Sequence, residues 1–289
     1  MLVNKFYNNL KTGLLLGLMA SLILIAGVMI AGQQGLMIAI ILAAVMNFVS
    51  FFFSDKIALM SAGAQEVGPE TELYQIVAEL AQGAGLPMPR VYISPQAAPN
   101  AFATGRGPNH AAVCATSGLL QMLNRREIAA VMGHELTHVK NRDVLTMTVT
   151  ATIAAAFTYL SYMFYFGGGR RDRDDVHPLL AILLIILGPI AAALIQAAIS
   201  RSREYNADTG GAELTGNPQA LASALEKIHA AAGQIPLEVN PAFNHLFIAE
   251  PRGVGQSIAN LFQTHPPLEK RLLNLIGREH TGQFRSAVA

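Results

Sequence analysis

The stretch His134-Glu135-Leu136-Thr137-His138 holds two histidines four residues apart. In a helix this spacing places both imidazoles on one face, so that both rings can reach a single metal ion. Zinc accepts imidazole nitrogens readily, and a catalytic zinc has three protein ligands and one open position for water. Glu135 stands next to the first histidine, where it can act as a general base on that water. The stretch therefore predicts a zinc-dependent peptidase.

The residues around this motif predict the helix that the chemistry requires. Asn124 and Glu127 have the spacing of a capping box, in which the first residue caps a helix and the second reaches back to it. Apolar residues then follow with a helical period at Ile128, Val131, Met132 and Leu136. This context argues against the alternative that two surface or core histidines happen to stand four residues apart.

The composition indicates a membrane protein. Charged residues make up 13% of the chain, against roughly 25% in an ordinary soluble domain. No charged residue occurs between Lys11 and Asp55, a window that holds two apolar runs, residues 13–31 and 35–53, on either side of Gly32-Gln33-Gln34. Each run is long enough to cross a hydrocarbon core of about 30 Å as a helix. We expect a retained anchor of two transmembrane helices rather than a cleaved signal peptide.

Two further uncharged runs, residues 144–166 and 178–199, predict a second transmembrane pair. The alternative for this pair is a buried helical hairpin in a soluble core. With four spans, one side of the membrane receives most basic residues, which are Lys5, Lys11, Lys56, Arg125, Arg126, Lys140, Arg142, Arg201 and Arg203. The loop at residues 170–175 places three arginines on the other side, which weakens the bias without reversing it. We therefore expect both termini and the metal motif on the cytoplasmic side.

A third metal ligand is expected at Glu204. The two predicted spans between His138 and Glu204 return the chain to the side it left, so the carboxylate can come back to both histidines. Asp208 follows four residues later on the same helix face, where it can accept a hydrogen bond from one of the zinc-bound imidazoles. The alternative is a solvated helix at a membrane exit, with Arg201 and Arg203 as topology signals. The histidine motif favours the ligand role.

The remaining pattern predicts an α+β fold with membrane helices: about four transmembrane helices and a mainly helical cytoplasmic domain with a small antiparallel sheet. Strands are expected at residues 90–94, 101–104 and 110–115, and helices at residues 70–84, 217–232 and 267–276. The expected organisation is a membrane anchor (1–53), a catalytic region with the metal-binding helix (54–143), a second transmembrane hairpin (144–199) and a catalytic region with the third ligand (200–289).

Other candidate residues have less specific signals. Asn100, Ala101 and Phe102 belong to a strand that could bind a peptide by strand addition, or be an ordinary hairpin strand. His265 could donate a hydrogen bond to a developing oxyanion or anchor the Pro266-Pro267 turn. The single cysteine, Cys114, excludes an intrachain disulfide and a cysteine-rich zinc site. The net charge of +1, without a basic and aromatic patch, gives no indication of nucleic-acid binding.

These motifs together resemble the HtpX family of bacterial membrane zinc metalloproteases. The matching segments are His134-Glu135-x-x-His138, Asn141-Arg142-Asp143, Arg203-Glu204-Tyr205-x-Ala207-Asp208, Asn100 to Gly105 and Thr264-His265-Pro266-Pro267. The resemblance implies a multi-pass protein of the bacterial inner membrane with a zincin-like domain facing the cytoplasm. It implies one zinc ion per chain on His134, His138 and Glu204, with Glu135 as the base.

The same resemblance implies polypeptide substrates, namely damaged or misassembled membrane proteins, together with self-cleavage. Two alternatives remain open at this point. One is a narrow-specificity processing protease of the prenyl-protein endoprotease type. The other is a non-catalytic membrane scaffold stabilised by zinc, which would have no need for Glu135 beside the metal. The sequence leaves the oligomeric state open.

Overall fold

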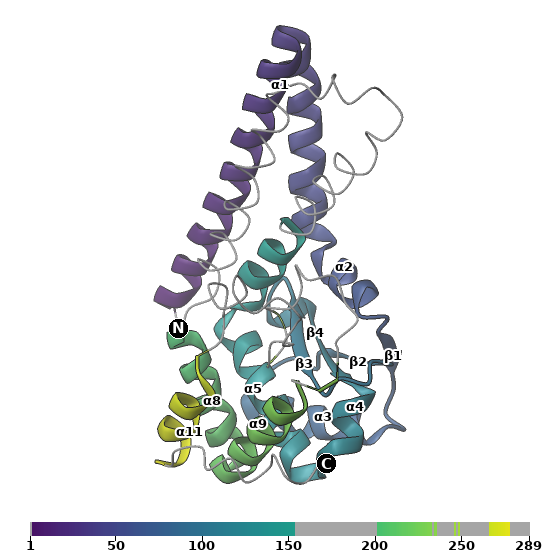
Figure 1. Ribbon diagram of the computed structural model, residues 1–289, viewed down its shortest axis with the longest axis vertical. Helices are drawn as coiled ribbons and strands as arrows, with labels where there is room; N and C mark the ends of the chain where they lie inside the picture. The colour runs from purple at the N-terminus through teal and green to yellow at the C-terminus, as the bar shows by residue number, and fades with distance from the viewer. Residues whose placement is uncertain are drawn as a thin grey trace.

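The computed structural model describes residues 2–153, 201–232, 234–235, 246, 248 and 266–277. Helix α1 (Leu2–Phe52) forms two helical arms, one that leads away from a body of helices and one sheet and one that returns to it (Figure 1). The reversal occurs where Gly32 adopts a left-handed φ of 57°, a conformation that glycine accepts without steric cost. The two arms touch, because a Cβ on Gly27 would lie 2.5 Å from the Ala39 Cβ. The predicted turn at Gly32-Gln33-Gln34 is therefore present.

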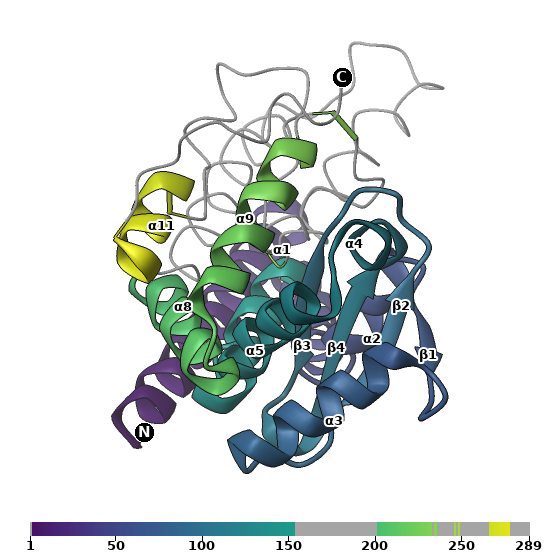
Figure 2. The same cartoon turned by 90° about the horizontal axis from the view of Figure 1, so that it is seen from below.

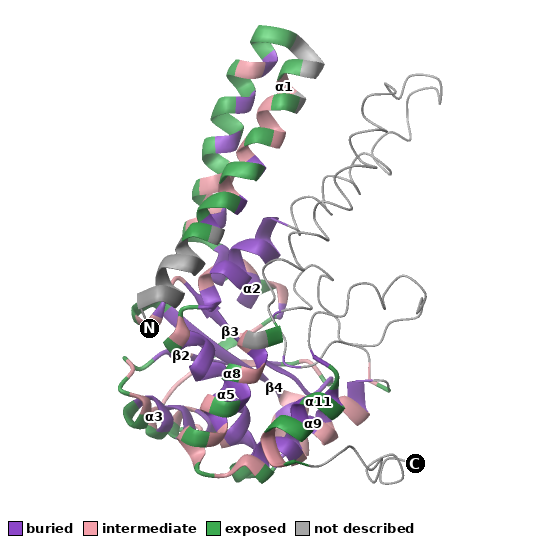
Figure 3. Cartoon of the chain, turned by 90° about the vertical axis from the view of Figure 1, so that its left-hand side faces the viewer, coloured by how far each residue is buried: buried purple, intermediate pink, exposed green. Residues whose placement is uncertain are grey.

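The arms of α1 expose apolar side chains along most of their length (Figure 3), with Ile38 and Ile41 each 66% exposed. Among the described residues, one helix, Gly32–Phe52, is long and apolar enough to cross a membrane, and Thr12–Ile25 and Val144–Ile153 are apolar but shorter. Residues 154–199, where the second pair of spans was predicted to continue, lie outside the described residues. The number of membrane crossings remains a prediction.

The sheet is mixed and has four strands, so the prediction of a small antiparallel sheet was wrong in part. Its strands are β1 (Gln65–Val67), β2 (Arg90–Ser94), β3 (Ala101–Gly105) and β4 (Ala111–Thr116). The spatial order is β1-β2-β4-β3, in which β2 and β4 are parallel and both other pairs antiparallel. The predicted β3–β4 hairpin is present. After β2 the chain forms β3 at the edge of the sheet and then β4 between β3 and β2. Strands β2 and β4 therefore run parallel.

Besides α1 and the apolar helix Val144–Ile153, seven α-helices are described with the sheet. They are α2 (Ser54–Ser61), α3 (Glu72–Ala84), α4 (Ser117–Met122), α5 (Arg125–Asn141), α8 (Arg201–Thr215), α9 (Pro218–Ala232) and α11 (Leu268–Ile276). Figure 2 shows α5 beside β3, with α8, α9 and α11 beyond it on the side away from β1. The main core joins the sheet to α3, α5, α9 and α11 through residues such as Ile76, Val113, Leu136, Leu221 and Leu272.

The capping box predicted for the motif helix is present at the start of α5. The Asn124 side chain accepts hydrogen bonds from the backbone of Arg126 and Glu127, and Glu127 accepts one from the Asn124 backbone at 3.0 Å. The Glu127 carboxylate also accepts hydrogen bonds from Lys227 and Ser223 of α9, each at 2.7 Å. Burial raises the pKa of Glu127, but these hydrogen bonds outweigh it and leave the pKa below its ordinary value. The start of α5 is thus fixed against α9.

Candidate metal centre

His134 and His138 of α5 and Glu204 of α8 come together in the interior of the fold. One ligand atom from each lies within 4.8 Å of the others, and all three residues are buried. The Glu204 carboxylate lies between the rings, with Oε2 3.8 Å from His134 Nε2 and Oε1 3.5 Å from His138 Nε2. The predicted ligands, far apart in sequence, are therefore close enough in the structure to share one ion.

The geometry and charge of this cluster fit a metal ion. Atoms that each bind one tetrahedral ion at about 2.0–2.2 Å lie roughly 3.3–3.6 Å from one another. The separation of 3.5 Å between His138 Nε2 and Glu204 Oε1 lies in this range, and that of 3.8 Å between His134 Nε2 and Glu204 Oε2 lies just above it. The surroundings also favour positive charge. Burial disfavours the charged form of His138, but the Asp143 hydrogen bond and the carboxylates of Glu204 and Glu135 raise its pKa to about 9. A group of buried carboxylates that stabilises a proton on imidazole also stabilises a cation placed between them.

The end of α5 supplies a partner for His138 that the sequence analysis missed. Arg142 takes a left-handed conformation with φ 62°, and the chain folds back so that the Asp143 backbone donates to the His138 carbonyl at 3.0 Å. This places Asp143 Oδ2 3.3 Å from His138 Nδ1. Asp143 therefore contacts His138 at Nδ1, and Nε2, the nitrogen nearer Glu204, is left for a metal. In the sequence, Asp143 was named only as part of the Asn141-Arg142-Asp143 match to the HtpX family, without a role of its own.

Asp208 contacts the other histidine, His134. Its Oδ1 lies 2.9 Å from His134 Nδ1, a close polar contact that is not well aligned as a hydrogen bond. Asp208 also forms a buried ion pair with Arg271 of α11, with Nη2 to Oδ1 at 2.6 Å and Nε to Oδ2 at 2.9 Å. The contact of Arg271 with Asp208 was not predicted from the sequence. The available signal was the position of Arg271 among Leu268 and Leu272 on the apolar face of α11, where an arginine needs a buried carboxylate.

Glycines allow α8 to approach α5 closely enough for Glu204 to reach both rings. A Cβ on Gly211 would lie 2.6 Å from the His134 backbone nitrogen, and one on Gly210 would lie 2.6 Å from the Thr137 side chain. From the other helix, a Cβ on Gly133 would lie 3.2 Å from the Gly211 carbonyl oxygen. The backbones therefore pack directly against each other at the level of the first histidine.

Replacing Gly211 by Ala is expected to push α8 away from α5, because the new methyl group meets rigid backbone rather than a flexible side chain. Overpacking of this kind costs about 1–3 kcal/mol, and the displaced Glu204 should lower metal affinity by about tenfold or more. Metal affinity measured by chelator competition checks this. Gly83→Ala is the matched control, since its Cβ would meet Leu214 only at 3.6 Å. Equal metal affinity in both variants would contradict the close-packing argument.

The remaining predicted site residues are placed as follows. Ala101 and Phe102 are buried at the start of β3, which is an edge strand, and Asn100 is buried just before it. The Ala101 carbonyl accepts a hydrogen bond from the Ile248 backbone at 3.0 Å, so part of this edge is already paired by the chain itself. His265 lies outside the described residues.

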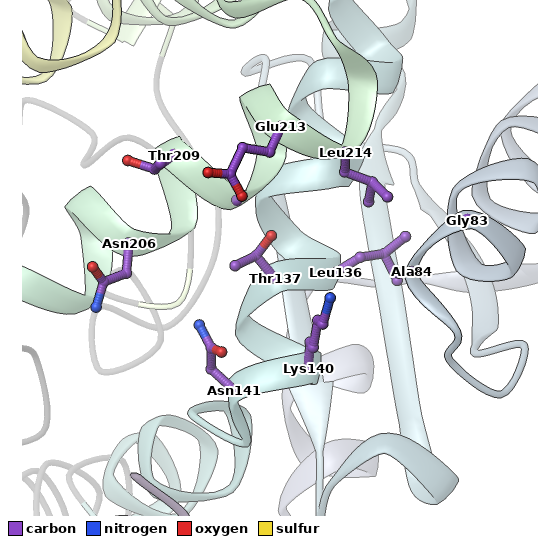
Figure 4. A pocket seen from close by; sticks show the side chains of 11 residues that line it. Gly83, Ala84, Leu136, Thr137, Lys140, Asn141, Asn206, Thr209, Glu213 and Leu214 are labelled. Atoms are coloured by element: carbon purple, nitrogen blue, oxygen red, sulfur yellow. The ribbon is translucent and has the colours of Figure 1, made fainter. Parts of the chain in front are cut away.

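A separate cavity of about 600 Å³ lies between α5, α8 and the end of α3 (Figure 4). It is lined mainly by polar side chains such as Thr137, Lys140, Asn141, Asn206 and Glu213. None of the three metal-binding candidates lines it. This cavity therefore does not belong to the metal centre.

Comparison with known proteins identifies the family of this metal centre. Residues 68–279 match the model of Peptidase family M48, and this range includes the histidine motif and Glu204. The chain belongs to peptidase family M48. M48 membership makes it a metalloendopeptidase, and the buried cluster of two histidines and a glutamate fits the metal site of such an enzyme.

M48 relatives described as "Protease HtpX homolog" match almost the whole chain. The one from Desulfatibacillum aliphaticivorans is 51% identical over 93% of this chain and 89% of the relative. The one from Burkholderia multivorans is 48% identical over 96% of this chain and 99% of the relative. The resemblance to HtpX inferred from the motifs is thereby confirmed, and with it the prediction of a membrane metalloprotease.

An M48-type fold is also found among solved structures. The crystal structure of S. mikatae Ste24p matches with a TM-score of 0.52 at 19% identity, over 96% of this chain and 67% of that chain. At this level of identity the match concerns the fold alone.

Proposed function

We propose that this metalloendopeptidase uses one zinc ion per chain, held by His134, His138 and Glu204, with Glu135 as the catalytic base. The observation that carries the proposal is the buried cluster of these three ligands from α5 and α8. Two imidazoles and one carboxylate form a ligand set of catalytic zinc sites, whereas magnesium and calcium prefer oxygen ligands alone. Glu135 lies on α5 next to the first ligand and is itself buried.

The protein residues around the ion have distinct tasks in this proposal. When bound, zinc lowers the pKa of water toward about 7 and polarises the scissile carbonyl. Glu135 removes a proton from the attacking water and passes it to the leaving amine. Its charge contributes to the raised pKa of both His138 and Arg271, which supports a position close to the ligand cluster. Asp143 and Asp208 hold the two imidazoles in orientation.

Substrates are proposed to be polypeptides bound as an extra strand along β3, near Asn100, Ala101 and Phe102. Strand addition uses main-chain hydrogen bonds and is therefore tolerant of side-chain sequence. This tolerance suits an enzyme that removes many damaged or misfolded membrane proteins in quality control and that cleaves itself. A peptide entering at Ala101 would take the place of the Ile248 hydrogen bond.

The membrane arrangement is proposed to be multi-pass, with four helices in a bacterial inner membrane and the metal site on the cytoplasmic side. The exposed apolar arms of α1 and the basic residues at the base of the predicted spans support it. Two cation–π contacts mark this base: Lys56 lies 5.5 Å from the Phe53 ring and Arg106 lies 5.1 Å from the Phe52 ring. The boundaries 1–53, 54–143, 144–199 and 200–289 remain part of this proposal.

The test of broad zinc-dependent proteolysis uses the full chain purified in detergent with a chelator. Zinc, or buffer alone, is added back, and cleavage of unfolded casein is followed with self-cleavage on the same gel. Cleavage of casein only after zinc addition is the expected result. Stoichiometric zinc binding without casein cleavage would instead favour a narrow-specificity processing protease, and cleavage restored by other divalent ions but never by zinc would contradict the metal assignment.

A further inference from the structure

Arg271 of helix α11 is a buried charge near the metal centre, and its guanidinium is hydrogen-bonded at every nitrogen. Arg271 is 3% exposed, and all three guanidinium nitrogens have partners. Nε and Nη2 bind both oxygens of Asp208, and Nη1 donates to the Ile248 carbonyl at 3.2 Å. The guanidinium is therefore held by a carboxylate of α8 and by the carbonyl of Ile248, whose backbone nitrogen donates to Ala101 of β3.

Asp208 stands between this arginine and a metal ligand. Its Oδ1 is shared by Arg271 Nη2 at 2.6 Å and His134 Nδ1 at 2.9 Å. A carboxylate at this position lies against Nδ1 and leaves Nε2, the nitrogen that faces Glu204, free to bind a metal. The orientation of His134 thus depends on where the Asp208 carboxylate is held.

Asp208 needs a cationic partner to act in this way, because it is fully buried at 0% exposure. An isolated carboxylate in such a place would take up a proton or turn toward solvent. The two hydrogen bonds from Arg271 compensate the buried carboxylate and fix both of its oxygens.

We propose that Arg271 is a positioning residue of the metal centre, which raises metal affinity by fixing Asp208 against His134 Nδ1. This inference rests on the proposed ligand set. It means that the affinity of a site built from α5 and α8 depends on a residue of α11, far along the chain from any ligand. The competing explanation is that the pair only fastens α11 to α8 and contributes to folding alone.

The experiment measures zinc affinity of the full chain in detergent, by competition with a chromophoric chelator, for Arg271→Met, Asp208→Asn and the double variant. Arg271→Met is expected to weaken zinc binding by up to about 10–100-fold, the usual effect of losing a partner of a metal-bound histidine, because Asp208 is then no longer held against His134. If Arg271 acts through Asp208, the double variant should bind zinc as Asp208→Asn does, within about threefold. Arg271→Lys keeps the positive charge but cannot form the bidentate pair with Asp208. Its zinc affinity should lie between those of wild type and Arg271→Met.

Lys227→Met is the matched control, since it breaks a second ion pair with a buried carboxylate, Glu127, that fastens α9 to α5. It should lower the melting temperature of the metal-free chain and leave zinc affinity unchanged. If Arg271→Met does not fold, Arg271→Lys and the double variant, which leaves no unpaired buried charge, carry the comparison.

Three results are distinguishable. Unchanged zinc affinity in Arg271→Lys and Arg271→Met, or losses that simply add in the double variant, would overturn the positioning role. Failure of the wild-type chain itself to bind zinc would overturn the proposed ligand set instead. Weakened zinc binding in the Arg271 variants that disappears in the Asp208→Asn background would support the inference.

Discussion

Replacing Glu135 by Gln is expected to reduce peptide hydrolysis by a factor of about 10²–10⁴ while leaving the metal in place. Glutamine has nearly the shape of glutamate, so α5 and its two histidines should remain as they are. Its amide, however, cannot accept a proton from the attacking water at neutral pH. The initial rate of casein cleavage and the zinc content per chain, measured on the same preparation, check both halves of this expectation.

Glu213→Gln is the matched control for this variant. Glu213 is exposed on α8 and lies in the cavity outside the metal centre, so the same chemical change should leave both rate and zinc content unaltered. Self-cleavage should stop in the Glu135 variant and continue in the control. Near-normal proteolysis by a zinc-loaded Glu135→Gln chain would show that Glu135 is not the catalytic base.

Glu204→Ala is expected to lose the metal altogether under conditions in which wild type binds one ion. The substitution removes a direct ligand, and the loss of affinity should exceed the roughly 10–100-fold that outer partners contribute. It also leaves two buried imidazoles without the carboxylate that now lies between them. Zinc per chain after dialysis against a weak chelator is the measurement, and hydrolysis should disappear with the metal.

The control for the third ligand comes from the same helix. Glu213→Ala removes an equally sized carboxylate from the exposed side of α8 and should retain the metal. Full zinc occupancy in Glu204→Ala would show that another residue completes the site and would separate Glu204 from the two histidines. Loss of zinc in both variants would indicate damage to α8 rather than removal of a ligand.

Local rules in the sequence were sufficient for the helix that carries the motif. Asn124 and Glu127 predict the start of α5 because capping depends on neighbours three residues apart, and the capping box is present as expected. Asn217 likewise caps α9 by accepting from the Ala220 backbone at 3.0 Å. Glu204 could be predicted because the apolar runs before it implied a return of the chain, and because the HtpX resemblance included it.

Long-range pairing could not be predicted in the same way. The order β1-β2-β4-β3 depends on the strands with which β4 pairs. The sequence of residues 111–116 does not indicate that β4 pairs with β2 as well as with β3. Strand β1 has only three residues and no clear alternation, so its pattern is too short to recognise. Asp143 and Arg271 act through contacts formed only in the folded chain, and their own sequence neighbourhoods give them no metal-site pattern.

Anomalous diffraction at the zinc edge tests the central claim most directly. Crystals of Glu135→Gln grown with zinc would keep the ligands and prevent self-cleavage. One strong peak per chain is expected, about 2.0–2.2 Å from His134 Nε2, His138 Nε2 and a Glu204 oxygen. A peak elsewhere, or one that contacts the histidines but not Glu204, would contradict it.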